Sequence, residues 1–172
     1  VGEWIAGMEK VADAVTNAQL VRLYVTEVGL HHPTSDTELS AALRAQSPYM
    51  TEMLKDFAKR HGAESVVLIG KDGNVVSSYG TIPPHLPEQP DIVRHVVENQ
   101  TGVIRPLRMG THGVVMDLIR PVFQPTQEGQ EAPAVGVFWA TLPAGDDLSQ
   151  LVASTPLDRV GERTAVLQDV NG

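Results

Sequence analysis

Four basic side chains lie close together in the second half of the chain: Arg105, Arg108, His112 and Arg120. The sequence around them predicts two strands joined by a turn at Gly110–Gly113, so all four residues are expected around one hairpin. A guanidinium group binds a carboxylate through paired N–H donors held in one plane. The pattern therefore favours a small anionic ligand such as a carboxylate. The alternative is that these side chains lie at strand ends in water and bind nothing.

The strand predicted over Val114–Phe123 carries two charges of opposite sign. Side chains alternate between the two faces of a strand, so Asp117 and Arg120 are expected on different faces. One of them therefore points at the face that helices cover, where an unpaired charge is costly to bury. We expect that residue either to contact a ligand or to be paired locally.

The residue types that catalysis commonly uses do not form catalytic patterns here. The chain has no cysteine, which excludes thiolate nucleophiles, disulfides and cysteine-type zinc sites. Nucleophile-elbow, phosphate-loop, dinucleotide-binding and His-Glu-x-x-His patterns do not occur. The six histidines are scattered, and the adjacent His31 and His32 are poorly placed to share one metal. We expect a binding domain without catalytic activity, and no cofactor or metal is implied.

Length and charge restrict the class of protein further. With 172 residues the chain suits one domain, with or without an appendage, and can bury a sizeable core. Its net charge of −8 argues against nucleic acid or an anionic membrane surface as a partner. No apolar run approaches the roughly 20 residues of a membrane span, and no signal peptide is visible. The chain begins at Val1 without a methionine, which is typical of a piece of a longer protein.

The first thirty residues predict one long amphipathic helix. Residues 3–29 contain no proline, and their apolar positions recur with helical spacing, although the stripe drifts between the two halves. Two interpretations stay open. The helix packs along its own domain, or it is a stalk that pairs with a second copy through Trp4, Met8, Val11 and Val15.

Two shorter helices are expected next. Ser35-Asp36-Thr37-Glu38 has the pattern of a capping box, which begins the first of them. Ser47-Pro48 then predicts a new start, with serine as the N-cap and proline in the first turn. Gly62 is expected to end this second helix.

The remaining elements predict a sheet with one inserted helix. Val66–Ile69 reads as a strand covered on both faces, and Asp72-Gly73 favours a tight type I′ turn into a second strand ending near Tyr79. A proline-rich loop, Thr81–Pro90, precedes a helix over Asp91–Gln100. Three further antiparallel strands follow, at Val103–Met109, Val114–Phe123 and Ala134–Leu142. The order indicates an α+β fold, with one five-stranded antiparallel sheet flanked by helices behind a long N-terminal helix.

This element order resembles the Cache superfamily, the PAS-like extracytoplasmic sensor domains of bacteria. The resemblance is carried by the hairpin Ser65–Ser78 with its Lys-Asp-Gly, by Arg120-Pro121-Val122-Phe123, and by Val135-Gly136-Val137-Phe138. It implies three parts: a stalk helix over 1–30, a PAS-like sensor unit over 31–153, and over 154–172 a linker and the start of a truncated membrane-proximal unit of a double Cache domain.

The resemblance also implies a function. Such a domain would lie in the periplasm or outside the cell, in a membrane-anchored and dimeric histidine kinase, chemoreceptor or cyclic-di-nucleotide enzyme, and would bind a small molecule. Tyr79 and Trp139 would form aromatic walls of the ligand site. The position at which an amino-acid-sensing branch carries aspartate falls near Thr141, which disfavours an amino-acid ligand. A cytoplasmic GAF- or PAS-type regulatory domain is the alternative, less favoured because of the long leading helix and the helix inserted after the first hairpin.

Overall fold

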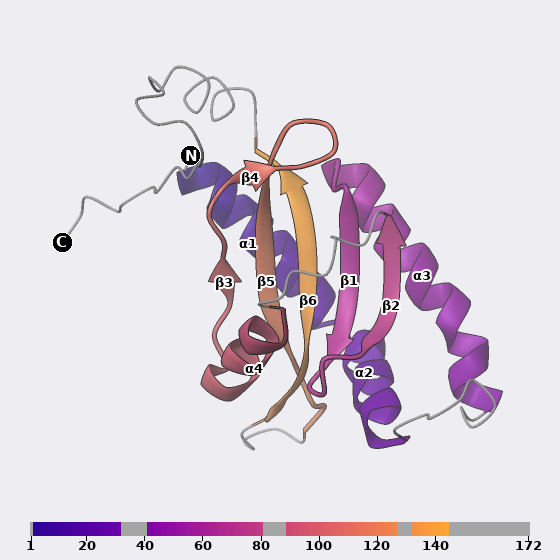
Figure 1. Ribbon diagram of the computed structural model, residues 1–172. Helices are drawn as coiled ribbons and strands as arrows, with labels where there is room; N and C mark the ends of the chain where they lie inside the picture. The colour runs from indigo at the N-terminus through magenta and orange to yellow at the C-terminus, as the bar shows by residue number, and fades with distance from the viewer. Residues whose placement is uncertain (1, 32–40, 81–88, 127–131, 145–172) are drawn as a thin grey trace, which may run out of the picture.

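The sheet forms the centre of the molecule (Figure 1). The computed structural model describes residues 2–31, 41–80, 89–126 and 132–144. Its strands are β1 Ser65–Gly70, β2 Val75–Gly80, β3 Val103–Ile104, β4 Arg108–Met109, β5 Val114–Phe123 and β6 Ala134–Pro143. They pair antiparallel in the order β2-β1-β6-β5-β3, with β4 also on β5. The α+β class with an antiparallel sheet is therefore confirmed.

The expected five strands become six because the third one is interrupted. Pro106 stands between β3 and β4 and has no N–H to donate to β5. The two pieces pair separately, Val103 opposite Ile119 and Arg108 opposite Val115.

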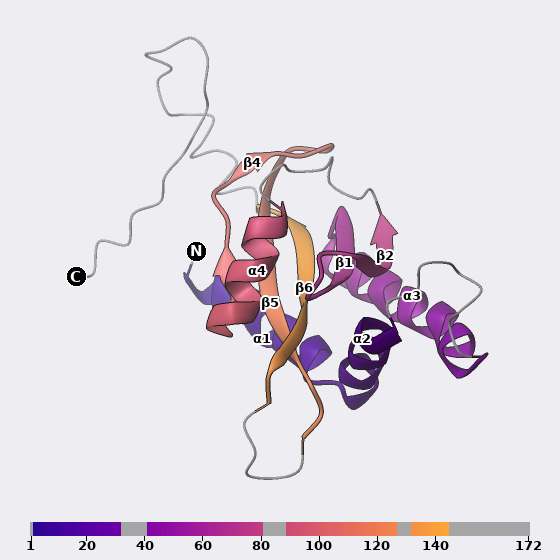
Figure 2. The ribbon, with the colours of Figure 1, turned by 60° about the horizontal axis from the view of Figure 1, so that its bottom comes forward.

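Helices cover both faces of the sheet. Helices α1 Gly2–Thr16, α2 Gln19–His31 and α3 Ala41–His61 lie on one face, and α4 Gln89–Asn99 lies on the other, as Figure 2 shows from a second side. Strand β1 is buried along its whole length, as expected for a strand with two covered faces. Its Val66 and Leu68 belong to the core under α1–α3, whereas Val67 and Ile69 pack with α4.

The expected single N-terminal helix is two helices. Helix α1 ends at Thr16 and α2 begins at Gln19, with Asn17 and Ala18 between them. The Thr16 hydroxyl donates to the Asp13 carbonyl, and the Ala18 N–H to the Val15 carbonyl, which tightens the last turn. Threonine and asparagine are weak helix formers. The break lets each half turn its own apolar stripe to the sheet, which explains the drift of the stripe in the sequence.

Helix α3 also differs from expectation. It runs unbroken from Ala41 to His61 with Pro48 inside it, so Ser47 is not an N-cap. Leu43, before the proline, is as fully buried as Met50 and Leu54 after it. Burial on both sides of Pro48 holds the helix together where the proline ring and missing N–H would otherwise favour an end.

The β1–β2 connection is longer than the type I′ turn predicted. Gly73 has a positive φ of 84°, but Asp72 does not, and the Gly73 N–H donates to the Gly70 carbonyl. The Asp72 carboxylate accepts from the Asn74 N–H, which fixes the loop from within.

Several expectations fall on residues outside the described ranges. They are the capping box at Ser35–Glu38, most of the proline-rich loop and the segment 154–172, so the proposed division into three parts stays a prediction. Among the residues described, no helix combines the length and apolar character that crossing a membrane requires.

Candidate functional site

A buried carboxylate on β5 is the centre of the candidate site. Asp117 is fully buried, with 0% of its surface exposed. Arg108 on β4 donates from Nε to Oδ2 and from Nη2 to Oδ1, each at 2.9 Å. Thr141 on β6 donates from its hydroxyl to Oδ1 at 2.7 Å. These three bonds compensate the lost hydration of the carboxylate, which would otherwise make its burial very costly.

The position of this Asp117 cluster, made of Arg108, Asp117 and Thr141, follows from strand register. Asp117 and Thr141 are direct partners between β5 and β6, so their side chains emerge on the same face. Arg108 pairs opposite Val115, two residues before Asp117 on the same face. The arginine therefore reaches along β5 to the carboxylate.

The cation of the cluster is partly open to water. Arg108 keeps 28% of its side chain exposed, against none for Asp117. Its bond to Asp117 raises the pKa of Arg108 above the ordinary value, so the guanidinium stays charged throughout the neutral range. Nε and Nη2 are used on Asp117, and no bond from Nη1 is found within the described residues. Arg108 is therefore held by one edge with N–H donors left on the other.

An apolar cluster adjoins the Asp117 cluster on the same face. Trp139 lies two residues before Thr141 on β6 and packs with Ile119 on β5 and with Val93 and Val96 of α4. Trp139 is 3% exposed, and its indole Nε1 has no hydrogen-bond partner in the described part of the chain. Buried indole N–H groups usually find an acceptor. An acceptor on a bound molecule would complete this site.

The turn between β4 and β5 is tied down beside the cluster. Glu64, directly before β1, accepts from the backbone N–H of Thr111 at 3.1 Å and of His112 at 2.9 Å. A Cβ at Gly110 would lie 2.7 Å from the Glu64 carboxylate, so a larger residue there would displace this carboxylate from the turn. His112 itself is exposed, and only its backbone takes part in this contact. Sequence reasoning missed Glu64, because nothing near it in the chain marks its partner.

The seven residues proposed from the sequence do not line one site. Arg108, Trp139 and Thr141 share the α4 face, and Arg105 is joined to them through its backbone N–H, which donates to the Asp117 carbonyl at 2.9 Å. Tyr79 packs against the core under α1–α3, on the opposite face. Arg120 lies on that face too, where it binds Asp13 and Glu9 of α1. The sheet therefore separates Tyr79 and Arg120 from the other residues.

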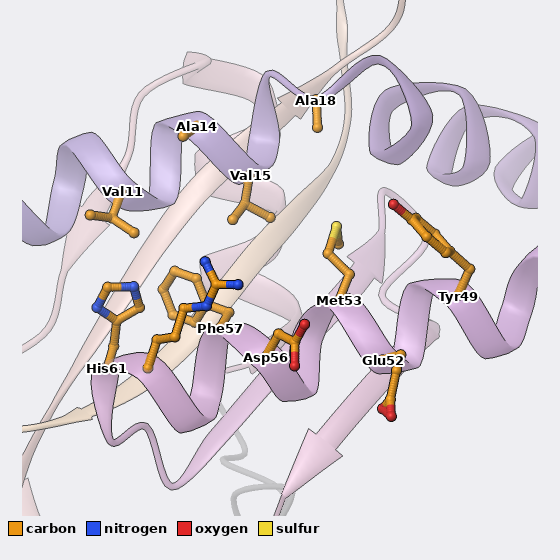
Figure 3. Close-up of a pocket in the computed structure, with 11 residues that line it drawn as sticks. Val11, Ala14, Val15, Ala18, Tyr49, Glu52, Met53, Asp56, Phe57 and His61 are labelled. Carbon is orange, nitrogen blue, oxygen red and sulfur yellow. The ribbon is translucent and has the colours of Figure 1, made fainter.

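A second concave surface lies between α1 and α3. This groove has a volume of about 450 Å³. Figure 3 shows Val11 and Val15 of α1 facing Met53 and Phe57 of α3 across it, with Tyr49 and His61 toward its two ends. Its walls are apolar and its charged residues (Glu52, Asp56 and Arg60) all belong to α3. Within the described ranges, no group of three or more His, Asp or Glu side chains is arranged to hold a metal.

Comparison with known proteins gives structural likenesses only. No family model matches the chain, and no curated protein matches it. Solved structures that do match include the ligand-binding domain of the Pseudomonas aeruginosa amino acid chemoreceptor PctC in complex with GABA, at 13% identity and a TM-score of 0.46. The match covers 88% of this chain and 56% of that one. The chain is similar to ligand-binding domains of bacterial chemoreceptors.

Two further structures belong to the same group of matches. The ligand-binding domain of Campylobacter jejuni Tlp3 with L-valine matches at 14% identity and a TM-score of 0.47, over 89% of this chain and 66% of that one. The ligand-binding domain of Pseudomonas fluorescens CtaA with L-serine matches at 12% identity and a TM-score of 0.46. This match covers 88% of this chain and 54% of that one. The chain thus spans little more than half to two thirds of the length of these domains.

Proposed function

We propose that this chain is the ligand-sensing domain of a bacterial transmembrane receptor and binds a small carboxylate on the α4 face of its sheet. The observation that carries the proposal is Arg108, whose partly exposed side chain is held on one edge by the fully buried Asp117. The motif resemblance to Cache domains and the α+β fold support the sensor class. The output of the receptor is that of a histidine kinase, chemoreceptor or cyclic-di-nucleotide enzyme.

Arg108 has the properties of a carboxylate receptor. Asp117 fixes the plane of the guanidinium, so little rotamer entropy remains to be lost when a ligand binds. The outer N–H donors then meet a ligand carboxylate, and Trp139 supplies an apolar wall with one N–H. Arg105, which follows β3 along the same edge of the sheet, adds a second positive charge. His112 and Thr141 complete the proposed contacts.

The receptor context is part of the same proposal. The domain lies in the periplasm or outside the cell, anchored by segments of the full protein, and two copies pair through α1. Ligand binding changes output only through its different affinity for two arrangements of the domain, typically about 1–3 kcal/mol of coupling. Fusion of a periplasm-dependent reporter enzyme to this domain in the full-length receptor tests the location, and reporter activity confined to the cytoplasm would refute it.

A thermal-shift screen with small carboxylates, amines and purines tests the ligand class. We expect a carboxylate to raise the melting temperature of the wild-type chain, and Arg108→Gln or Arg105→Gln to reduce that rise at least severalfold. Arg94→Gln is the matched control, because Arg94 is an exposed arginine on α4 paired with Asp91. Titration calorimetry below the melting temperature of each variant separates lost binding from lost stability.

Two results would overturn the ligand assignment. If a carboxylate still raises the melting temperature by the wild-type amount in both Arg108→Gln and Arg105→Gln, the ligand binds elsewhere. An amine that binds the wild type and is lost in Asp117→Asn but not in Arg105→Gln would make Asp117, rather than Arg108, the ligand contact.

A further inference from the structure

Arg120 joins the sheet to helix α1 from the face opposite the Asp117 cluster. Its Nε donates to Asp13 Oδ1 at 2.8 Å and its Nη2 to Asp13 Oδ2 at 3.0 Å, a two-pronged arginine–carboxylate pair. Its Nη1 also donates to Glu9 Oε1 at 3.2 Å, one helical turn earlier on α1. We call these three residues the Arg120 latch. It links positions more than a hundred residues apart.

Strand β5 connects the latch to the Asp117 cluster. Asp117 and Arg120 are three residues apart on one strand, and alternation places them on opposite faces. Between them, Ile119 packs with α4 and pairs with Val103 of β3. A shift of β5 at Asp117 therefore moves the backbone from which Arg120 reaches α1.

A second connection runs from α4 through Gly102. A Cβ at Gly102 would lie 2.6 Å from Arg120 Nη1 and 2.7 Å from its Cδ, so the arginine side chain passes directly over this glycine. Gly102 stands between α4, which ends at Asn99, and β3. Gln100 on this short connection has a positive φ of 55°, which fixes how the chain leaves α4. The connection that leaves α4 on one face of the sheet thus contacts the latch on the opposite face.

Helix α1 is the element best able to respond. Among its described side chains only Ala12 and Thr16 are buried, whereas Trp4, Met8, Val11 and Val15 are partly exposed. The groove between α1 and α3 runs along α1, and the helix is interrupted at Asn17 and Ala18, directly after α1. Elements with few buried contacts open at the lowest free energy, so the loss of even one contact such as the latch should be measurable in α1.

We propose that the Arg120 latch couples the state of the Asp117 cluster to the attachment of α1 on the sheet. The proposal rests on the proposed function only in taking the Asp117 cluster as the place where a ligand acts. A change in the Asp117–Arg108 pair moves β5 and the Gly102 connection, and the latch turns that movement into a tighter or looser α1. Arg120 is therefore a positioning residue that acts through Asp13 and Glu9, without touching the ligand.

Hydrogen–deuterium exchange on the ligand-free chain tests the coupling. We expect Arg120→Gln to raise the exchange rate of α1 amides about threefold or more while α4 stays unchanged. Asp117→Asn should raise α1 exchange in the wild-type background but add nothing once Arg120 is replaced. Arg22→Gln is the matched control, because Arg22 of α2 also bonds across the sheet end, to the carbonyls of Phe123 and Gln124. Its effect should be confined to α2.

Two further variants keep the test decisive if a single change unfolds the chain. Thr141→Val removes one hydrogen bond of the Asp117 cluster with little change in shape. It is the variant to use if Asp117→Asn does not fold. The exchanged pair Asp13→Arg with Arg120→Asp should return α1 exchange toward the wild-type rate. Unchanged α1 exchange in Arg120→Gln overturns the proposal. So does an effect of Asp117→Asn or Thr141→Val that persists without Arg120. Neither result depends on any ligand, so the proposed function is tested separately.

Discussion

The side chains of Asp117 and Thr141 face each other across β5 and β6, and the threonine hydroxyl donates to the aspartate at 2.7 Å. Both are buried at the point where the apolar cluster around Trp139 ends. A hydroxyl and a carboxylate on neighbouring central strands would be an expensive arrangement in a purely structural core. Here Arg108 stabilises the buried carboxylate with two hydrogen bonds and a positive charge. It does so from a two-residue strand at the edge of the sheet.

Replacing Arg108 by glutamine should destabilise the chain by about 3 kcal/mol, because it leaves the buried Asp117 carboxylate without its counter-charge. Urea unfolding followed by circular dichroism measures the loss. The double variant with Asp117→Asn should lose clearly less than the two single changes added together. Additive losses would contradict a direct Arg108–Asp117 pair.

Replacing Trp139 by phenylalanine should separate ligand binding from folding. The change keeps an aromatic ring against α4 and removes the N–H, which has no partner among the described residues, together with part of the buried ring system. The melting temperature should therefore fall modestly, as expected for a small cavity. The rise in melting temperature caused by the ligand should fall. A marked loss of stability with unchanged ligand response would show that the indole only fills the core.

Glycine at position 80 should be required for the fold. Gly80 has a φ of 88°, and a Cβ there would lie 2.2 Å from the Glu64 carbonyl oxygen. We expect Gly80→Ala to cost about 3 kcal/mol, from backbone strain and from this collision. The control is Gly7→Ala in α1, where a Cβ meets nothing within 4 Å. It should stabilise by roughly 0.5–1 kcal/mol, and equal effects of the two changes would refute the geometry.

Pairing of two copies through α1 should be visible as cysteine crosslinks. The chain has no cysteine of its own, so Met8→Cys or Val15→Cys provides a single thiol. In the full-length receptor that we propose, oxidation should link two subunits at these positions. Asn99→Cys, at the exposed end of α4, is the control and should remain monomeric. If neither α1 position crosslinks, α1 serves only its own domain.

The parts of the fold that local pattern determines were predictable. Strand β5 and helix α4 lie within about a residue or two of their predicted limits, because alternation, proline and glycine mark them. The interruption between α1 and α2 and the continuity of α3 through Pro48 could not be predicted. Both depend on which apolar residues the sheet can bury. Local propensity gives way where tertiary packing decides.

The candidate site was only partly predictable for a similar reason. Alternation correctly placed Arg120 opposite to Asp117, whereas the pairing of Arg108 with Asp117 was not predicted. The partners of Arg120, Asp13 and Glu9, come from a helix that the sequence separates from it by a hundred residues. Tyr79 was assigned to the ligand because aromatic residues suit binding sites, although the β1–β2 register turns it toward α3.

The central position of β6 has a consequence for biosynthesis. β6 separates β1 from β5 in the sheet, yet it is the last strand among the described residues. The Arg22 and Arg120 contacts also wait for the end of β5. During synthesis α3 can pack on the β1–β2 hairpin early, whereas α1 and β1 must wait for β5 and β6. Contacts so distant in sequence slow folding. The complete sheet, and with it both the Asp117 cluster and the core on either face, can therefore form only after Pro143 has emerged.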